Sequence, residues 1–145
     1  MSTEENKATV RRWVEAAWNT GDLSSADTLY AADYEYHDPA SPAPVRGVEG
    51  IKGLVTMYRA ALPDLQFTIE DMVAEGDKVV WRWTVRGTQT GPLMGLPPTG
   101  KRATVTGIII SRFANGKWQE DYNNWDTFGM LKQMGVIPAP EAATV

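Results

Sequence analysis

The sequence contains no cysteine and only one histidine among its 145 residues. Without cysteine the chain can form no disulfide and cannot use a thiolate as a nucleophile or as a metal ligand. A single histidine excludes the centres in which several histidines hold a metal, and no stretch of the sequence concentrates carboxylates for another kind of metal site. We therefore expect no bound metal, with a site made of carboxylates alone as the alternative.

Long apolar runs and an excess of basic residues are also missing. No stretch is apolar enough to span a membrane, and residues 1–5, MSTEE, are acidic where a secretory signal would be basic and then apolar. The 14 Lys and Arg against 18 Asp and Glu give a net charge of −4, and the pI is near 5.0, which disfavours contact with phosphate backbones. We expect no membrane or nucleic-acid partner and a cytoplasmic location.

The composition that remains is that of an ordinary globular protein. Hydrophobic residues make up 43% of the chain and charged residues 22%, so neither disorder nor a fibrous array is indicated. A chain of 145 residues has the length of one domain with one substantial core. We predict a single domain over residues 1–145.

Apolar residues recur at helical spacing in three parts of the first half of the chain. The first part begins with Ser2-x-x-Glu5, the pattern of a capping box. Before the third part, alternation predicts a strand with Tyr34 and Tyr36 on one face, and prolines then predict a surface loop. The predicted helices span residues 2–21, 23–30 and 48–62, the strand spans 33–38, and the loop spans 39–47.

The second half of the chain favours long strands joined by tight turns. Alternation places Trp81 and Trp83 on a face that we expect to be buried, and a loss of phase near Asp71 predicts a bulge. Residues 90–100 are rich in glycine and proline, and we expect them to form a flap over a cavity. The predicted strands span residues 65–73, 78–89, 101–113 and 118–126, and a short helix spans 127–134. This order predicts an α+β domain in which a strongly curved antiparallel sheet wraps N-terminal helices in a cone-shaped fold.

The junction between the last strand and the last helix carries an acid, Asp126. Strict alternation puts one set of side chains on the same side of the strand as this acid, and we expect that side to line a pocket, with solvent as the alternative. Asp126 is also a favoured residue for a helix N-cap. The set comprises Trp118, Glu120, Tyr122, Asn124 and Asp126.

Five short motifs, in this order, resemble the SnoaL-like polyketide cyclases of the NTF2-like superfamily. The resemblance covers nearly the whole chain, and it implies a cone-shaped fold with a deep apolar cavity. It also implies an aspartate that acts as acid and base in an intramolecular aldol ring closure of a small hydrophobic substrate, without a metal or cofactor. The motifs are Asp33-Tyr34-x-x-His37-Asp38-Pro39, Pro63-Asp64-Leu65, Gly87-Thr88-x-Thr90-Gly91, Gly95-x-Pro97-Pro98-Thr99-Gly100 and Asp126-x-x-Gly129-x-Leu131-x-Gln133-x-Gly135.

The resemblance implies that Asp126 is the acid/base residue and that His37 is a polar residue of the pocket, which could stabilise an enolate. His37 has a structural alternative as a hydrogen-bonded histidine. The chain differs from many members in the last strand, where Glu120-Asp121-Tyr122 replaces a frequent Glu-His-Trp. We expect the substrate to contact Trp18, Tyr58, Met94, Ile110, Arg112, Tyr122 and Asn124.

Two other functions fit the same sequence. One is epoxide hydration of the limonene epoxide hydrolase type, for which Asp126 and Arg112 would supply part of the required site. The other is a non-catalytic module that binds a small molecule. We also predict a homodimer, because a curved sheet with Trp81 or Trp83 on its outer face would expose apolar area that monomers rarely expose.

Overall fold

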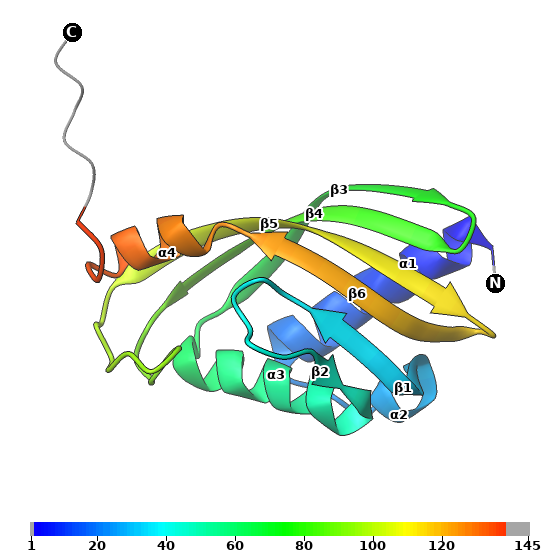
Figure 1. Ribbon diagram of the computed structural model, residues 1–145, viewed down its shortest axis with the longest axis horizontal. Coiled ribbons are helices and arrows are strands. Elements are labelled where there is room, and N and C mark those ends of the chain that lie inside the picture. The colour runs from blue at the N-terminus through cyan, green and yellow to red at the C-terminus, as the bar shows by residue number, and fades with distance from the viewer. Residues whose placement is uncertain (1, 139–145) are drawn as a thin grey trace, which may run out of the picture.

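The protein, a computed structural model in which residues 2–138 are described, is a long curved sheet with its N-terminal helices on one side (Figure 1). The helices are α1 (Thr3–Trp13), the π-helix η1 (Val14–Asn19), α2 (Ala26–Leu29), α3 (Gly47–Ala61) and α4 (Thr127–Gln133). The strands are β1 (Tyr30–His37), β2 (Val45–Arg46), β3 (Gln66–Glu75), β4 (Lys78–Thr88), β5 (Arg102–Ala114) and β6 (Lys117–Trp125).

The first helix begins as its sequence predicts. The Ser2 hydroxyl accepts a hydrogen bond from the backbone N–H of Glu5 at 3.1 Å, which satisfies one of the free donors of the first turn. The predicted single helix instead changes to π geometry at Val14. The second helix is also shorter than predicted, one turn, because Tyr30 already pairs with the last strand. Among residues 2–138, no helix has the length and apolar character needed to cross a membrane.

The six strands form one sheet in the order β2-β1-β6-β5-β4-β3. Strands β3 to β6 are an antiparallel meander, as predicted, whereas β1 lies parallel to β6 and closes one side of the sheet. The short strand β2 pairs with β1 inside the stretch predicted to be loop only. The α+β cone expected from the sequence is therefore the observed fold.

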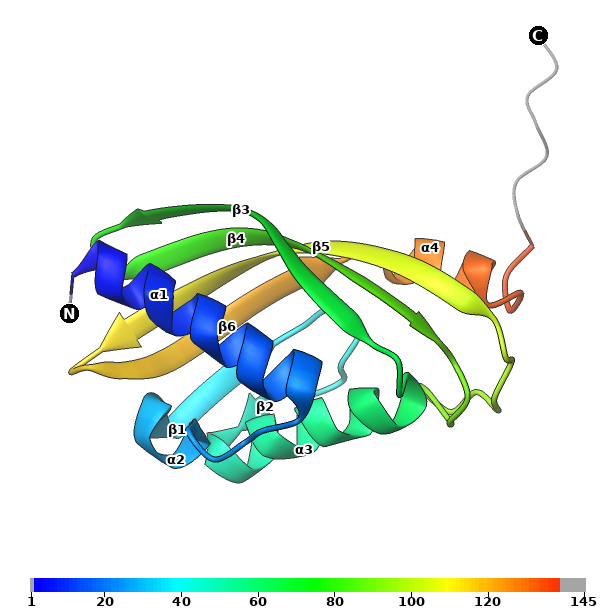
Figure 2. The same cartoon turned by 180° about the vertical axis from the view of Figure 1, so that it is seen from behind.

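The concave face of the sheet is the buried one. Figure 2 shows α1 and α3 on this side, crossing beneath the strands. Trp81 and Trp83 point toward the helices and are buried, as predicted for that face of β4. They are consequently not on the outer face. The predicted dimer therefore cannot rest on apolar area that Trp81 or Trp83 would expose there.

Two β-bulges change which residues face inward. The register of β3 slips between Ile69 and Asp71, close to the predicted position. The second bulge was not predicted: Phe113 pairs with Trp118 but Arg112 pairs with Glu120, so β6 has one extra residue, Gln119. A bulge reverses the alternation of a strand from that point on.

The phase change corrects the predicted facing of β6. Strict alternation predicted that Asp121, Asn123 and Trp125 face the opposite side from Trp118. Because of the bulge, all four lie on the inner side. The inner set is Trp118, Asp121, Asn123 and Trp125, and the outer set is Glu120, Tyr122 and Asn124.

The loop from residue 90 to 100 is closed on itself. The buried Gln89 side chain donates to the carbonyls of Gly91 and Pro97 at 3.1 and 3.2 Å and accepts from Thr99 at 2.7 Å. Met94 lies at the tip with a φ of 51° and is 43% exposed. These contacts hold the loop in one shape. No residue from 90 to 100 lines the apolar cavity described below, so the predicted flap stays a prediction.

Candidate active site

An apolar cavity lies between the concave face of the sheet and the helices α1, η1 and α3. Its atom-free space is about 760 Å³, with the open mouth included. All six tryptophans of the chain line it. They are Trp13, Trp18, Trp81, Trp83, Trp118 and Trp125.

The helical wall of the cavity contains two of the predicted substrate-contacting residues. Trp18 packs against Tyr58 and Phe67 with ring centroids 6.2 and 5.2 Å apart, and all three line the cavity. Rings held in this way present flat faces with few polar atoms. The cavity is therefore suited to a flat, apolar ligand.

Asp121 is the only carboxylate that lines the cavity among the described residues. Its side chain is buried and accepts hydrogen bonds from the hydroxyls of Tyr34 and Ser111 and from the indole N–H of Trp118, the last at 2.9 Å. Burial raises the pKa of Asp121 to about 6, although the three hydrogen bonds act in the opposite direction. Burial also raises the pKa of Tyr34, so that this hydroxyl keeps its proton and donates.

Beside Asp121 on β6, Asn123 brings an amide to the same wall. Its Oδ1 accepts from the indole N–H of Trp83 at 3.1 Å, and its Nδ2 donates to the hydroxyl of Tyr36 at 2.8 Å. Because an indole N–H can only donate, the amide has one possible orientation. An amide nitrogen carries two hydrogens, so Asn123 keeps one for a ligand in the cavity.

Asp126 is the N-cap of α4, the alternative that its sequence position left open. Its Oδ1 accepts from the backbone N–H of Gly129 at 2.8 Å, and the side chain is exposed. It does not line the cavity, and the apolar surroundings that the predicted acid/base role needs are absent. The catalytic role of Asp126 stays a prediction without support from its position.

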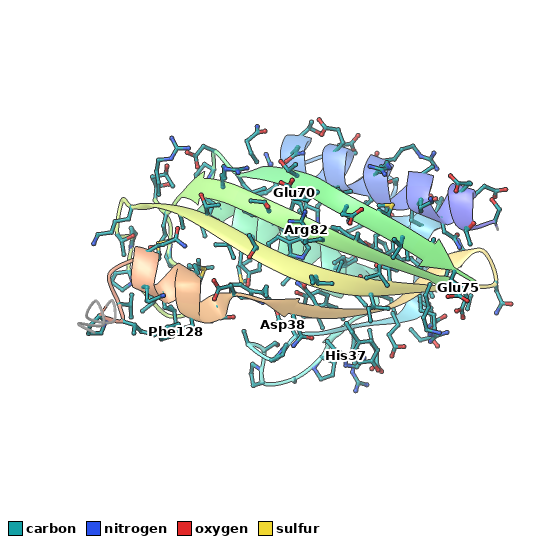
Figure 3. The ribbon with its side chains drawn as sticks, turned by 90° about the horizontal axis from the view of Figure 1, so that it is seen from above. His37, Asp38, Glu70, Glu75, Arg82 and Phe128 are labelled. Carbon is teal, nitrogen blue, oxygen red and sulfur yellow. The ribbon has the colours of Figure 1, made fainter. Side chains whose placement is uncertain are left out.

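His37 lies on the outer side of the sheet, beside the turn that leads to the 38–44 loop (Figure 3). Its ring stacks on Tyr122 with centroids 4.4 Å apart. Together with Asn124 and the loop, these two residues line a second, shallower pocket. The structure thus brings together three of the predicted site residues, His37, Tyr122 and Asn124, but outside the apolar cavity.

The ligand atoms of Glu35, His37 and Glu120 lie within 4.8 Å of one another, and they are the one group of this kind among residues 2–138 that could hold a metal ion. His37 Nε2 is 3.4 Å from Glu35 and 3.2 Å from Glu120. Both carboxylates also pair with arginines, Glu120 with Arg112 at 3.2 Å and Glu35 with Arg46 at 3.9 Å. These ion pairs already compensate the negative charge, so the group needs no cation.

The remaining predicted contacts are also outside the cavity. Ile110 is 40% exposed on the outer face, because the inward positions of β5 are the odd-numbered ones, from Ala103 to Phe113. Arg112 lies on that same outer face. Asp126 bonds through its backbone N–H to Thr106, six residues from Arg112 along β5, so the two cannot share one site of the epoxide hydrolase type. The predicted residues placed outside the cavity are Met94, Ile110, Arg112, Tyr122 and Asn124.

Sequence reasoning missed Asp121, Asn123 and Tyr36 as cavity residues. The aromatic residues gave no clear signal, because strict alternation places Trp118 and Tyr122 on one face of the strand and Trp125 on the other.

Known proteins resemble the chain over most of its length. The family model of the SnoaL-like polyketide cyclases matches residues 8–134. The aklanonic acid methyl ester cyclase of Streptomyces peucetius is 32% identical over 139 residues, which cover 91% of this chain and 92% of that protein. The nogalonic acid methyl ester cyclase of Streptomyces nogalater is 28% identical over 127 residues, which cover 83% and 90%. Among solved structures, TsrD of Streptomyces laurentii has a TM-score of 0.78 and 34% identity, over 90% of this chain and 97% of that one.

Proposed function

The chain belongs to the SnoaL-like polyketide cyclase family, and we propose that it closes a ring in a small hydrophobic polyketide by an intramolecular aldol-type reaction without a cofactor. One observation carries the proposal: a cavity lined by every tryptophan of the chain contains, among residues 2–138, a single buried carboxylate, that of Asp121. An apolar cavity with one acid/base group is what this reaction requires.

In the proposed reaction, Asp121 replaces the residues that the sequence suggested. Its carboxylate takes a proton from a carbon next to a carbonyl, and the enolate that forms attacks a second carbonyl of the same molecule. The new alkoxide then receives a proton from Asp121, so that no atom is gained or lost. A pKa of about 6 supports this role, because a general base works best when its pKa is near the working pH.

The free N–H of Asn123 is a suitable donor for the enolate oxygen. It belongs to an amide whose orientation is fixed by Trp83 and Tyr36, and a donor that does not need to reorganise stabilises developing charge most effectively. The aromatic walls contribute by folding the substrate so that its two reacting carbons meet, an effect that is worth several kcal/mol.

The first substrates to test come from the relatives. The two relatives described above are named as cyclases of aklanonic acid methyl ester and of nogalonic acid methyl ester, and we propose that this chain accepts the same class of methyl ester. The assay incubates the protein with aklanonic acid methyl ester and with nogalonic acid methyl ester, and it separates substrate and cyclised product of equal mass by chromatography. Saturable binding of both esters without product would instead favour the non-catalytic binding module.

The homodimer stays a proposal, with a different surface. On the outer face, Val80, Ile110 and Tyr122 are neighbours across three strands, and Ile108 lies next to them on β5. Ile108, Ile110 and Tyr122 are 52%, 40% and 50% exposed. A second copy packed on this patch would remove that apolar area from water. A cytoplasmic location likewise stays a prediction of the sequence.

A further inference from the structure

We propose that Asp38 is a positioning residue for the cavity, acting through Tyr36 and Trp125; this inference rests on the proposed function. Asp38 does not line the cavity but lies behind its wall, at the second pocket. Its Oδ2 accepts from the hydroxyl of Tyr36 at 3.0 Å and from the indole N–H of Trp125 at 2.7 Å. Its Oδ1 accepts from the backbone N–H of Ala40 at 2.7 Å, which fixes the carboxylate itself.

The two donors come from different strands. Tyr36 is on β1 and Trp125 ends β6, and both rings line the cavity. The ladder between these strands stops at the pair His37 and Tyr122, three residues before Trp125. Trp125 still pairs with Gly107 of β5, but Asp38 provides the link between β1 and β6 beyond the end of their own ladder.

Asp38 also sets the direction of a chain of hydrogen bonds. Trp83 donates to Asn123, Asn123 donates to Tyr36, and Tyr36 donates to Asp38. A tyrosine hydroxyl has one hydrogen, and the carboxylate holds it on the far side of the wall. Without that acceptor the hydrogen of Tyr36 can turn into the cavity, beside the free N–H that Asn123 offers to the substrate. Asp38 thus determines which donors the substrate meets.

Three variants test the role through kinetics. Asp38→Ala removes both acceptor oxygens and should lower kcat by about 10- to 100-fold with little change in KM, because the substrate still binds but is held less accurately. Asp38→Asn keeps an acceptor oxygen and should retain most of kcat. Asp33→Ala is the matched control. Asp33 is an exposed acid on β1, the strand that leads to Asp38, and among the described residues its side chain accepts from Gln119 alone, at 2.9 Å. Its loss should leave both constants unchanged.

Two kinetic outcomes would overturn the proposal. One is an Asp38→Ala variant that folds and keeps the parent kcat. The other is an Asp38→Asn variant whose kcat is as low as that of Asp38→Ala. Turnover would then depend on the negative charge at this position and not on a hydrogen-bond acceptor. If Asp38→Ala does not fold, Tyr36→Phe and Trp125→Phe each remove one donor, and parent values of kcat in both would equally refute the role.

A spectroscopic measurement separates this inference from the proposed function. The indole N–H of Trp125 should give a nitrogen-15 NMR signal shifted by its charged acceptor, and in Asp38→Ala this signal should move and its hydrogen should exchange faster. An unmoved Trp125 signal overturns the positioning role whatever the activity. Loss of turnover in Asp121→Asn together with parent kinetics in all Asp38 variants would overturn the positioning role and leave the proposed function standing.

Discussion

Replacing Asp121 by asparagine separates its chemical role from its structural one. The amide has the size of the carboxylate and can keep its hydrogen bonds. Its oxygen can take the place of Oδ1, which accepts from Ser111 and from the donor-only indole of Trp118. Its NH2 group then faces Tyr34, whose hydroxyl can accept instead of donate. We therefore expect Asp121→Asn to fold.

The effect on stability follows from the raised pKa. Burial raises the pKa of Asp121 from 3.8 to about 6, a difference that corresponds to about 3 kcal/mol. The stability linked to this raised pKa is fully present below about pH 4 and is lost as the pH rises through about 6, because the folded state must then bury a charge. Asparagine has no such charge. The difference in unfolding free energy should therefore move in favour of the variant by about 2 kcal/mol between pH 4 and pH 7, because part of the full effect is already lost at pH 4.

Urea unfolding of the parent and of Asp121→Asn, at pH values from 4 to 8, measures this difference, and other titrating groups cancel in the comparison. On the methyl esters the variant should be slower by roughly 10² to 10⁴-fold, the usual effect of losing a general base. A difference in stability that does not change with pH would refute the buried charge. A stable variant with parent turnover would refute the acid/base role.

Three further variants address the rest of the site. Asp126→Asn keeps a capping oxygen for Gly129, so it should cost no more than about 1 kcal/mol in unfolding free energy and leave turnover unchanged. A variant that melts at the same temperature as the parent but has lost turnover would support the acid/base role first predicted for Asp126. Gly107→Ala would place a methyl group against the Trp83 ring and 2.8 Å from Trp125 Cβ, and it should cost about 1 to 3 kcal/mol in unfolding free energy and weaken ligand binding measured by tryptophan fluorescence; parent values of both would mean that the rings can move aside. Ile110→Lys puts a charge in the outer apolar patch and should give a monomer in solution scattering with the fold unchanged; a dimer in the variant would exclude this patch as the interface.

Much of the fold could be predicted because the sequence carries local signals. The capping pattern at Ser2, the alternation around Trp81 and the loss of phase near Asp71 each predicted a feature that the structure contains. These signals depend on neighbours within a few residues. The parallel pairing of β1 with β6 depends instead on residues about 85 positions apart, such as His37 and Tyr122, and no local pattern predicts it.

The candidate site was harder to predict because polar residues on a strand fit either face. Tyr122 and Asn124 have side chains that would suit a pocket, yet they face outward, while Asn123 faces inward and accepts from the buried Trp83. Asp126 illustrates a second difficulty. Aspartate is a favoured N-cap and also a common acid/base residue, so the residue type alone does not distinguish the two roles. The surroundings of the side chain in the structure do.

The extra residue in β6 connects the fold to the site. In a regular strand, residues three apart point to opposite faces, so Trp118 and Asp121 could not meet. The bulge at Gln119 turns both inward, and the indole N–H of Trp118 then donates to Asp121 at 2.9 Å. That bond is one of three that stabilise a buried carboxylate, whose desolvation without partners would be prohibitive. Strict alternation could not predict the bulge at Gln119, and this bulge is what allows an acid to lie in the apolar cavity. Bulges beside functional sites often redirect a side chain in this way.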